Sequence, residues 1–330
     1  MSKKKFGGLG QYIGTVGALL ILCVILTIVS DTFLTYNNIM SILKQTTFTA
    51  LTAAGMLLCL ITAGIDLSVG ANAIFCACMV GMLLNKGVDN AFLLIIVPLI
   101  AGTAIGLING LLLTRLHLPH PFVSTLGMKN FLWGAALLVT GSQMVSGFPN
   151  SVMWLGTATI GGFPIGYIVV IVIYVIMHIL LTRTALGRSI YCAGGNPEAT
   201  RLSGINSANV LTFCYTISGL MAGIAGIVSL GRSGTANGAT AIQPYDTDAI
   251  ASCVIGGASF MGGKGTMLGT MIGALVIATL RNGFTLLAIS SAVQNMVLGL
   301  VIIAAVLLDV YREAMAAFAR RREAAAKARA

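Results

Sequence analysis

A glycine-rich stretch at residues 256–266, GGASFMGGKGT, contains the residue types of a phosphate-binding loop. Such a loop requires a serine or threonine directly after its lysine, where the hydroxyl reaches Mg²⁺, and it follows a β-strand. Here Lys264 is followed by Gly265, and the residues before the stretch are part of a long apolar segment. The sequence therefore argues against ATP binding and favours a tight turn around Lys264, in which glycines such as Gly262 and Gly263 supply positive φ angles.

Other patterns that could support catalysis or metal binding are weak. The seven cysteines include no C-x-x-C pair, so they indicate neither a disulfide framework nor a zinc site. His117 and His120 have the spacing of a helical metal pair, but Pro119 and Pro121 prevent a regular helix there. No Ser–His–Asp order and no paired carboxylates stand out. The sequence predicts that this chain is not an enzyme and binds no metal or cofactor of its own.

The elements that carry these residues are apolar. The chain is 57% hydrophobic and 8% charged, whereas a soluble domain carries about 25% charged residues. A helix needs roughly 20 apolar residues to cross about 30 Å of hydrocarbon, and windows of this kind recur without the alternation of a barrel strand. We expect an all-α polytopic membrane protein with about ten transmembrane helices. The predicted spans are 13–30, 46–62, 67–84, 91–113, 122–140, 164–182, 210–230, 244–258, 266–288 and 293–309.

Glycine accounts for 40 residues. Many stand four residues apart, as Gly102 and Gly106 do, and Gly219 and Gly223. In lipid, small residues at this spacing let helix backbones approach closely. The predicted role of most glycines is therefore helix packing.

The charge distribution sets the orientation. Basic residues cluster at both ends of the chain and in a long central loop, and the positive-inside rule places such segments in the cytoplasm. We expect one transmembrane domain over 1–330, with cytoplasmic tails at 1–12 and 310–330 and a cytoplasmic loop at 183–209. Lys264 then falls inside the cell. The loops expected outside are 141–163 and 231–243. Nucleic acid is not expected as a partner, because the basic residues flank membrane segments.

The acidic residues bear on the energy source. Ion-coupled carriers need ionisable groups deep in the bundle, but the predicted spans leave all nine acidic residues near span ends. Asp246 and Asp248 fall near outer ends and Asp66 near an inner end. In the turn AGIDLSVG, Asp66 or Ser68 is predicted to cap the N-terminus of the third span. The pattern favours energy supplied by a partner.

The central loop contains a short helix signal. Asn196 is a good N-cap, Pro197 suits the first helical position, and Glu198 places a carboxylate in the first turn. Gly204 is expected to end the helix. The predicted element is either a solvated connector or, as we favour, a docking site for a partner protein at the end of the bundle.

Four motifs resemble, in order, the permease subunit of bacterial ABC sugar importers, in particular its ribose, xylose and galactose branch. They are ITAGIDLSVG (61–70), LPHPFVSTLGM (118–128), TALGRSIYCAGGNPEATRLSGI (184–205) and VIGGASFMGGKGTMLGTMIGALVI (254–277). The resemblance implies import of a ribose-like pentose or a hexose across the bacterial inner membrane. It also implies cytoplasmic subunits that bind ATP and Mg, a periplasmic solute-binding protein and a second permease copy or paralogue.

The resemblance further implies that the coupling helix of this family corresponds to Gly195–Gly204. The residues expected to contact the ATPase are Gly195, Asn196, Pro197, Glu198, Ala199, Arg201 and Leu202. Lys129 and Trp133 depart from the residues expected in this family, so its pore details do not transfer. The resemblance leaves open another solute, such as a nucleoside, a branched-chain amino acid or a signalling furanose. An ion-coupled secondary carrier is the less favoured alternative.

A sugar path requires hydroxyl, amide and aromatic partners. The candidates are Asn72, Asn109, Asn130, Phe131, Trp133 and Asn295. For each of them, interhelical hydrogen bonding or packing is the favoured interpretation. Lys129 lies about two turns into the fifth span, where it either snorkels to the cytoplasmic surface, as we favour, or lines the conduit.

Overall fold

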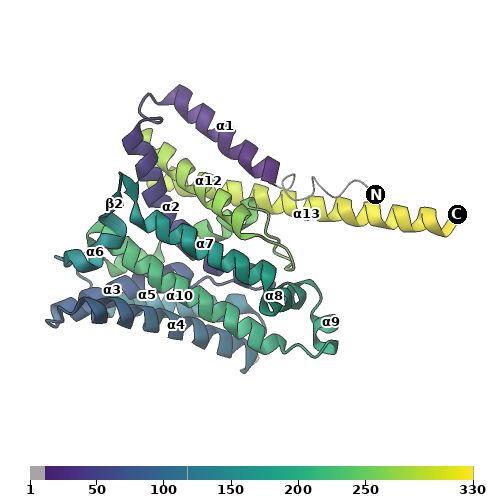
Figure 1. Ribbon diagram of the computed structural model, residues 1–330, viewed down its shortest axis with the longest axis horizontal. Helices are drawn as coiled ribbons and strands as arrows, with labels where there is room; N and C mark the ends of the chain where they lie inside the picture. Colours follow the sequence, from purple (N-terminus) through teal and green to yellow (C-terminus); the bar gives the residue numbers. More distant parts are fainter. Residues whose placement is uncertain (1–11, 117, 330) are drawn as a thin grey trace.

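The computed structural model describes residues 12–116 and 118–329, and these residues are almost entirely helical. The helices lie side by side in one bundle (Figure 1). The predicted tail 1–12, apart from its last residue, and His117 lie outside the described residues. In chain order the elements are α1 (Ile13–Val29), α2 (Tyr36–Ile61), α3 (Val69–Asn85), α4 (Ala91–Thr114), α5 (Pro121–Thr140), β1 (Val145–Ser146), α6 (Asn150–Thr157), β2 (Thr159–Ile160), β3 (Phe163–Pro164), α7 (Ile165–Arg183), α8 (Ala185–Gly195), α9 (Pro197–Leu202), α10 (Ser207–Ser233), β4 (Thr235–Ala236), η2 (Gly238–Ile242), α11 (Tyr245–Ile255), α12 (Met267–Leu286) and α13 (Ser291–Arg329).

Each predicted span coincides with a helix, but not all of these helices have the length of a membrane span. By length and composition, six of the described helices could cross a membrane: α2, α4, α5, α7, α10 and α12. Helices α1 and α3 and the Ser291–Leu307 part of α13 are apolar but shorter. Helix α11 has 11 residues, and at 1.5 Å per residue it covers roughly half of a 30 Å hydrocarbon core. The all-α polytopic architecture is confirmed, while the number of ten spans stays a prediction.

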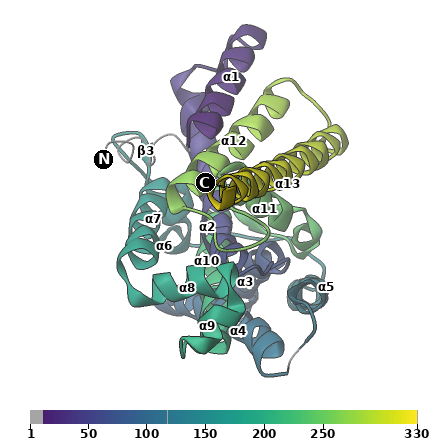
Figure 2. The ribbon, with the colours of Figure 1, turned by 90° about the vertical axis from the view of Figure 1, so that its right-hand side faces the viewer.

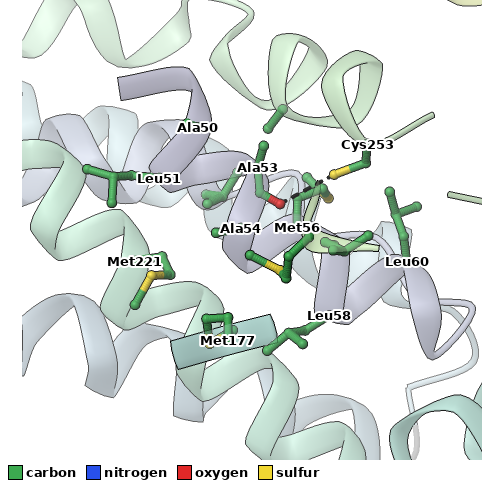
Figure 3. Close-up of a cluster of buried hydrophobic side chains, with 14 of the residues drawn as sticks. Ala50, Leu51, Ala53, Ala54, Met56, Leu58, Leu60, Met177, Met221 and Cys253 are labelled. Atoms are coloured by element: carbon green, nitrogen blue, oxygen red, sulfur yellow. Dashed lines mark hydrogen bonds between the residues drawn. The ribbon is translucent and has the colours of Figure 1, made fainter. Parts of the chain in front are cut away.

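Helix α2 forms the centre of the bundle. Every residue from Thr46 to Ile61 is buried. Figure 3 shows its alanine and leucine side chains packed with Met177 of α7, Met221 of α10 and Cys253 of α11. The thiol of Cys253 donates a hydrogen bond to the carbonyl oxygen of Ala53 over 3.3 Å. A buried helix of this kind positions its neighbours on all sides.

Glycines bring α4 and α10 into backbone contact. A Cβ atom added to Gly106 would overlap the carbonyl oxygen of Tyr215, and one added to Gly219 would overlap that of Gly102. The predicted packing role of these glycines is confirmed. Their lack of a side chain sets the distance between the two helices.

Helices α3 and α11 both begin inside the bundle. The Tyr245 ring, at the first residue of α11, meets the Phe48 ring edge-on with centroids 4.9 Å apart. Phe48 lies half-way along α2. A Cβ on Gly70, at the start of α3, would lie 2.7 Å from the Cβ of Tyr245. Residues 62–68 therefore turn back from the end of α2 into the interior before α3 starts.

The two ends of the bundle carry different elements. Figure 1 shows α8, α9 and the end of α13 at one end, and α6 and β2 at the other. The predicted tail 310–330 does not form a separate segment, since α13 continues through it to Arg329. At the α6 end, Val145 of β1 pairs with Ala236 of β4. This pairing joins the loops 141–163 and 231–243, which were predicted to share one side of the membrane.

Candidate functional site

The short helix α9 begins as its sequence indicates. The Asn196 side chain accepts a hydrogen bond from the backbone N–H of Ala199 over 3.0 Å, and Pro197 occupies the first helical position. Gly204, with φ +76°, follows the end of the helix. Asparagine at the cap and proline after it both favour a helix start.

Helix α9 presents charges and one leucine to solvent. The Arg201 guanidinium donates to the Glu198 carboxylate over 2.8 Å, and the two side chains are 70% and 68% exposed. This hydrogen bond raises the pKa of Arg201. Leu202 is 75% exposed, while Thr200 is the buried residue of the helix. The exposed residues agree with a docking surface, and their contact with an ATPase stays a prediction.

Helix α8 was not predicted, because the sequence of residues 185–195 was interpreted as a polar loop. Its N-cap is Thr184, whose hydroxyl accepts from the N–H of Gly187 over 3.0 Å. The Tyr191 hydroxyl donates to the carbonyl of Gly265 over 2.7 Å, and burial raises the pKa of this phenol. Helix α8 thus connects α9 to the glycine-rich turn at 256–266 (Figure 2).

The same turn and α8 both contact the end of α2. A Cβ on Gly194 would overlap the carbonyl oxygen of Ile61. That oxygen accepts a hydrogen bond from the N–H of Gly263 over 2.8 Å. The φ angles of Gly262 and Gly263 are +79° and +70°, which confirms the predicted glycine turn. Lys264 lies on this turn and is exposed.

A buried polar network lies where residues 62–68 enter the interior. Asp66 accepts from the N–H of Ser68 at 3.0 Å and from its hydroxyl at 2.6 Å. Its second oxygen accepts from the Ser218 hydroxyl of α10 at 2.7 Å. The Asn109 amide of α4 donates to Ser68 over 2.8 Å. The Asp66 carboxylate therefore binds the amide of Ser68, the residue before α3, whereas the Ser68 side chain caps no amide of α3. The network joins the start of α3 to α4 and α10.

Two substitutions of Asp66 distinguish the contribution of its hydrogen bonds to stability from the contribution of its volume. Asp66→Ala leaves the buried hydroxyls of Ser68 and Ser218 without their acceptor, at about 1–3 kcal/mol for each unsatisfied group. Asp66→Asn keeps an acceptor oxygen and nearly the same volume. Thermal unfolding of the purified chain in detergent should show a clearly lower Tm for Asp66→Ala than for Asp66→Asn. Equal shifts in the two variants would contradict the role of the network.

Two ion pairs connect α11 to its neighbours, and both involve residues that sequence reasoning misplaced. Lys129 Nζ of α5 lies 2.9 Å from both oxygens of Asp246. Arg281 of α12 donates from Nε and Nη2 to the two oxygens of Asp248, each over 2.7 Å. The prediction that Asp246 and Asp248 lie near outer ends is wrong, because both are buried at the start of the half-length helix α11. The snorkelling of Lys129 is likewise replaced by an interhelical ion pair.

A signal for these pairs is present in the sequence. Acidic residues two apart open an apolar segment at Tyr245, and single basic residues interrupt the apolar segments that contain Lys129 and Arg281. Charges within apolar spans pair with one another. The partners are separated by 117 and 33 residues, so local patterns do not connect them.

Comparison with known proteins identifies the family. Residues 38–306 match the model described as the permease component of the branched-chain amino acid transport system. The chain belongs to this permease family. Its relatives include the ribose import permease of Escherichia coli, 39% identical over 88% of this chain and 91% of that protein. The D-allose transport system permease of the same organism is 37% identical over 93% and 95%, and its galactose/methyl galactoside import permease 32% over 94% and 97%. No solved structure was found to match the chain.

The resemblance to sugar permeases is thereby confirmed over most of the permease. Asn72 and Asn109, two of the predicted path residues, are buried inside the helix bundle. The Asn72 amide donates to the carbonyl of Gly102 in α4 over 3.1 Å, and Asn109 belongs to the network of Asp66. Both contacts fit the interhelical interpretation that the sequence favoured.

The other predicted path residues do not gather around one site. Asn130 and Phe131 lie on the exposed side of α5, and Asn295 is exposed on α13. Trp133 is half-buried, and its Nε1 has no hydrogen-bond partner among the described residues of the permease. The role of these four residues in a solute path stays a prediction.

Proposed function

We propose that the chain is the membrane-spanning subunit of an ATP-binding-cassette importer that carries a monosaccharide, a ribose-like pentose or a hexose, into the cytoplasm. The observation that carries this proposal is the 39% identity to a ribose import permease over 88% of the chain. The glycine-rich turn at 256–266 is built as a structural turn against α2 and α8. This supports a system in which a separate subunit binds and hydrolyses ATP.

In this proposal, the region of α9 docks to the ATPase. The contacting residues are those predicted from sequence: Gly195, Asn196, Pro197, Glu198, Ala199, Arg201 and Leu202. The chain forms one permease domain in a bacterial inner membrane with both termini in the cytoplasm. Figure 1 supports this topology, since the start of α1 and the end of α13 lie at the same end as α9. The further partners are a periplasmic solute-binding protein and a second permease copy or paralogue.

Transport by the reconstituted complex tests the function. The chain would be purified with its partner ATPase and solute-binding protein and placed in liposomes that contain ATP. We expect uptake of radiolabelled D-ribose, D-allose or D-galactose that stops when ATP is omitted or the ATPase is left out. Labelled leucine serves as the competing solute, because the family description names branched-chain amino acids. Uptake driven by a proton or Na⁺ gradient without ATP would instead identify a secondary carrier.

A further inference from the structure

Helices α11 and α12 form one rigid unit. The Arg281 guanidinium binds the Asp248 carboxylate through two parallel hydrogen bonds of 2.7 Å, a geometry that fixes orientation as well as distance. Close to this pair, the two backbones touch: a Cβ on Gly273 would overlap the carbonyl oxygen of Ser252, and one on Gly269 would overlap that of Gly256. The two helices therefore cannot slide past each other without breaking several contacts.

Helix α5 forms a second unit with η2. A Cβ on Gly238, the first residue of η2, would lie 2.7 Å from the carbonyl carbon and oxygen of Ala136 in α5. Only Gln243 and Pro244 separate the end of η2 from the start of α11. The chain thus has a two-residue joint between a unit that contains α5 and a unit that contains α11.

The ion pair between Lys129 and Asp246 spans this joint. It differs from the Arg281–Asp248 pair in chemistry, whereas the burial of the two pairs is similar. The ammonium group is a point charge on a flexible stem, with three hydrogens and no fixed fork. The side chains of Lys129 and Asp246 are 18% and 5% exposed, and those of Arg281 and Asp248 are 26% and 6% exposed. Because one ammonium nitrogen holds a carboxylate less firmly than a bidentate guanidinium does, the Lys129–Asp246 pair opens at a smaller free-energy cost than the arginine fork.

We propose that Lys129–Asp246 is a latch that opens and closes between α5 and α11 during transport, whereas Asp248–Arg281 stays closed throughout. This inference rests on the proposed function, because the latch opens during the transport cycle of that importer. When the latch is closed, it holds the start of α11 against α5 at mid-depth in the bundle. When it opens, the joint at Gln243–Pro244 allows the unit of α11 and α12 to move relative to α5.

Two substitutions test the latch: lysine is replaced by arginine in the proposed latch, and arginine by lysine in the pair that stays closed. Lys129→Arg offers Asp246 a fork, and charge-assisted bidentate contacts are stronger than a single ammonium contact. We expect this variant to keep or raise the Tm of the purified complex and to lower ATP-driven D-ribose uptake by about threefold or more. The matched control is Arg281→Lys, which weakens the fixed pair. It should lower the Tm while uptake per folded complex stays within about twofold of the unchanged chain.

Reversible cross-linking gives a second measurement that does not depend on how arginine fits. In a chain that carries Cys23→Ala and Cys192→Ala, the thiols introduced by Lys129→Cys and Asp246→Cys would be joined by a cleavable bifunctional reagent. We expect cross-linking to stop uptake and a reducing agent to restore it. The same treatment of the Asp248→Cys/Arg281→Cys variant should leave uptake unchanged.

The outcomes distinguish the latch from the proposed function. Unchanged uptake after cross-linking of 129 to 246 would overturn the latch, as would a Lys129→Arg complex with a raised Tm and unimpaired uptake. If the unchanged complex transports none of the three sugars, the proposed function fails on its own. The latch is then judged by the ATP hydrolysis rate of the complex, which the 129–246 cross-link should lower and the 248–281 cross-link should not.

Discussion

Charge reversal at Glu198 or Arg201 will stop solute uptake while ATP hydrolysis by the complex continues. Both side chains lie in the open on α9, where their mutual ion pair contributes little to stability. The fold should therefore survive Glu198→Arg or Arg201→Glu. When α9 docks to an ATPase, however, the same charges become part of an interface. Reversing one of these charges would replace an attraction to the partner by a repulsion. We expect uptake in proteoliposomes to fall by at least about tenfold, which corresponds to 1.4 kcal/mol.

The exchange of both charges provides the control for this prediction. The double variant Glu198→Arg/Arg201→Glu restores an ion pair within α9 but presents the wrong sign at each position to the partner. We expect the double variant to transport as poorly as either single variant, with a Tm equal to that of the unchanged chain. Recovery of uptake in the double variant would mean that the pair only supports α9 and does not contact the ATPase.

Gly106→Val will prevent stable assembly of the bundle. The added atoms would overlap the carbonyl oxygen of Tyr215, which belongs to the backbone of α10 and cannot rotate away. Overpacking costs about 1–3 kcal/mol where side chains can adjust, and a fixed backbone places the cost at the upper end or above. We expect a strongly reduced yield of folded chain and a Tm lower by about 10 °C, given 2–4 °C per kcal/mol in domains of moderate size.

Two glycines of α5 serve as matched controls. Gly127 and Gly134 have nothing within 4 Å of an added Cβ. Gly127→Val and Gly134→Val introduce the same side chain with the same intrinsic penalty in a helix, but without the backbone overlap. Their thermal unfolding should stay close to that of the unchanged chain. Similar losses in all three variants would show that helix propensity, not the contact of α4 with α10, governs the effect.

Local chemistry in the sequence was sufficient to predict some features. The cap of α9 depends on Asn196 and on Pro197 directly after it, so its geometry can be derived from neighbours. The positive φ angles at Gly262 and Gly263 follow from residue type in the same way. Hydropathy located the membrane helices because lipid demands long apolar segments.

Depth and long-range pairing could not be derived in this way. Hydropathy gives the order of spans along the chain, but the depth at which α11 begins is set by Phe48 and Gly70, which lie far away in sequence. Lys129 was expected to reach the surface because its partner, Asp246, lies 117 residues later. Helix α8 was missed because its glycines and Arg188 resemble a loop, whereas packing on α2 stabilises it as a helix.

The contact of Gly194 with Ile61 has a mechanical consequence. Where two side chains meet, a rotamer change can take up a displacement of one of them. Here the main chain of Gly194 contacts the main chain of Ile61, so no side-chain rotation can absorb a displacement. Close-packed protein interiors are stiff and pass strain onward. A displacement of α9 that moves α8 would therefore reach the end of α2 through main-chain contact, next to the point where residues 62–68 turn inward.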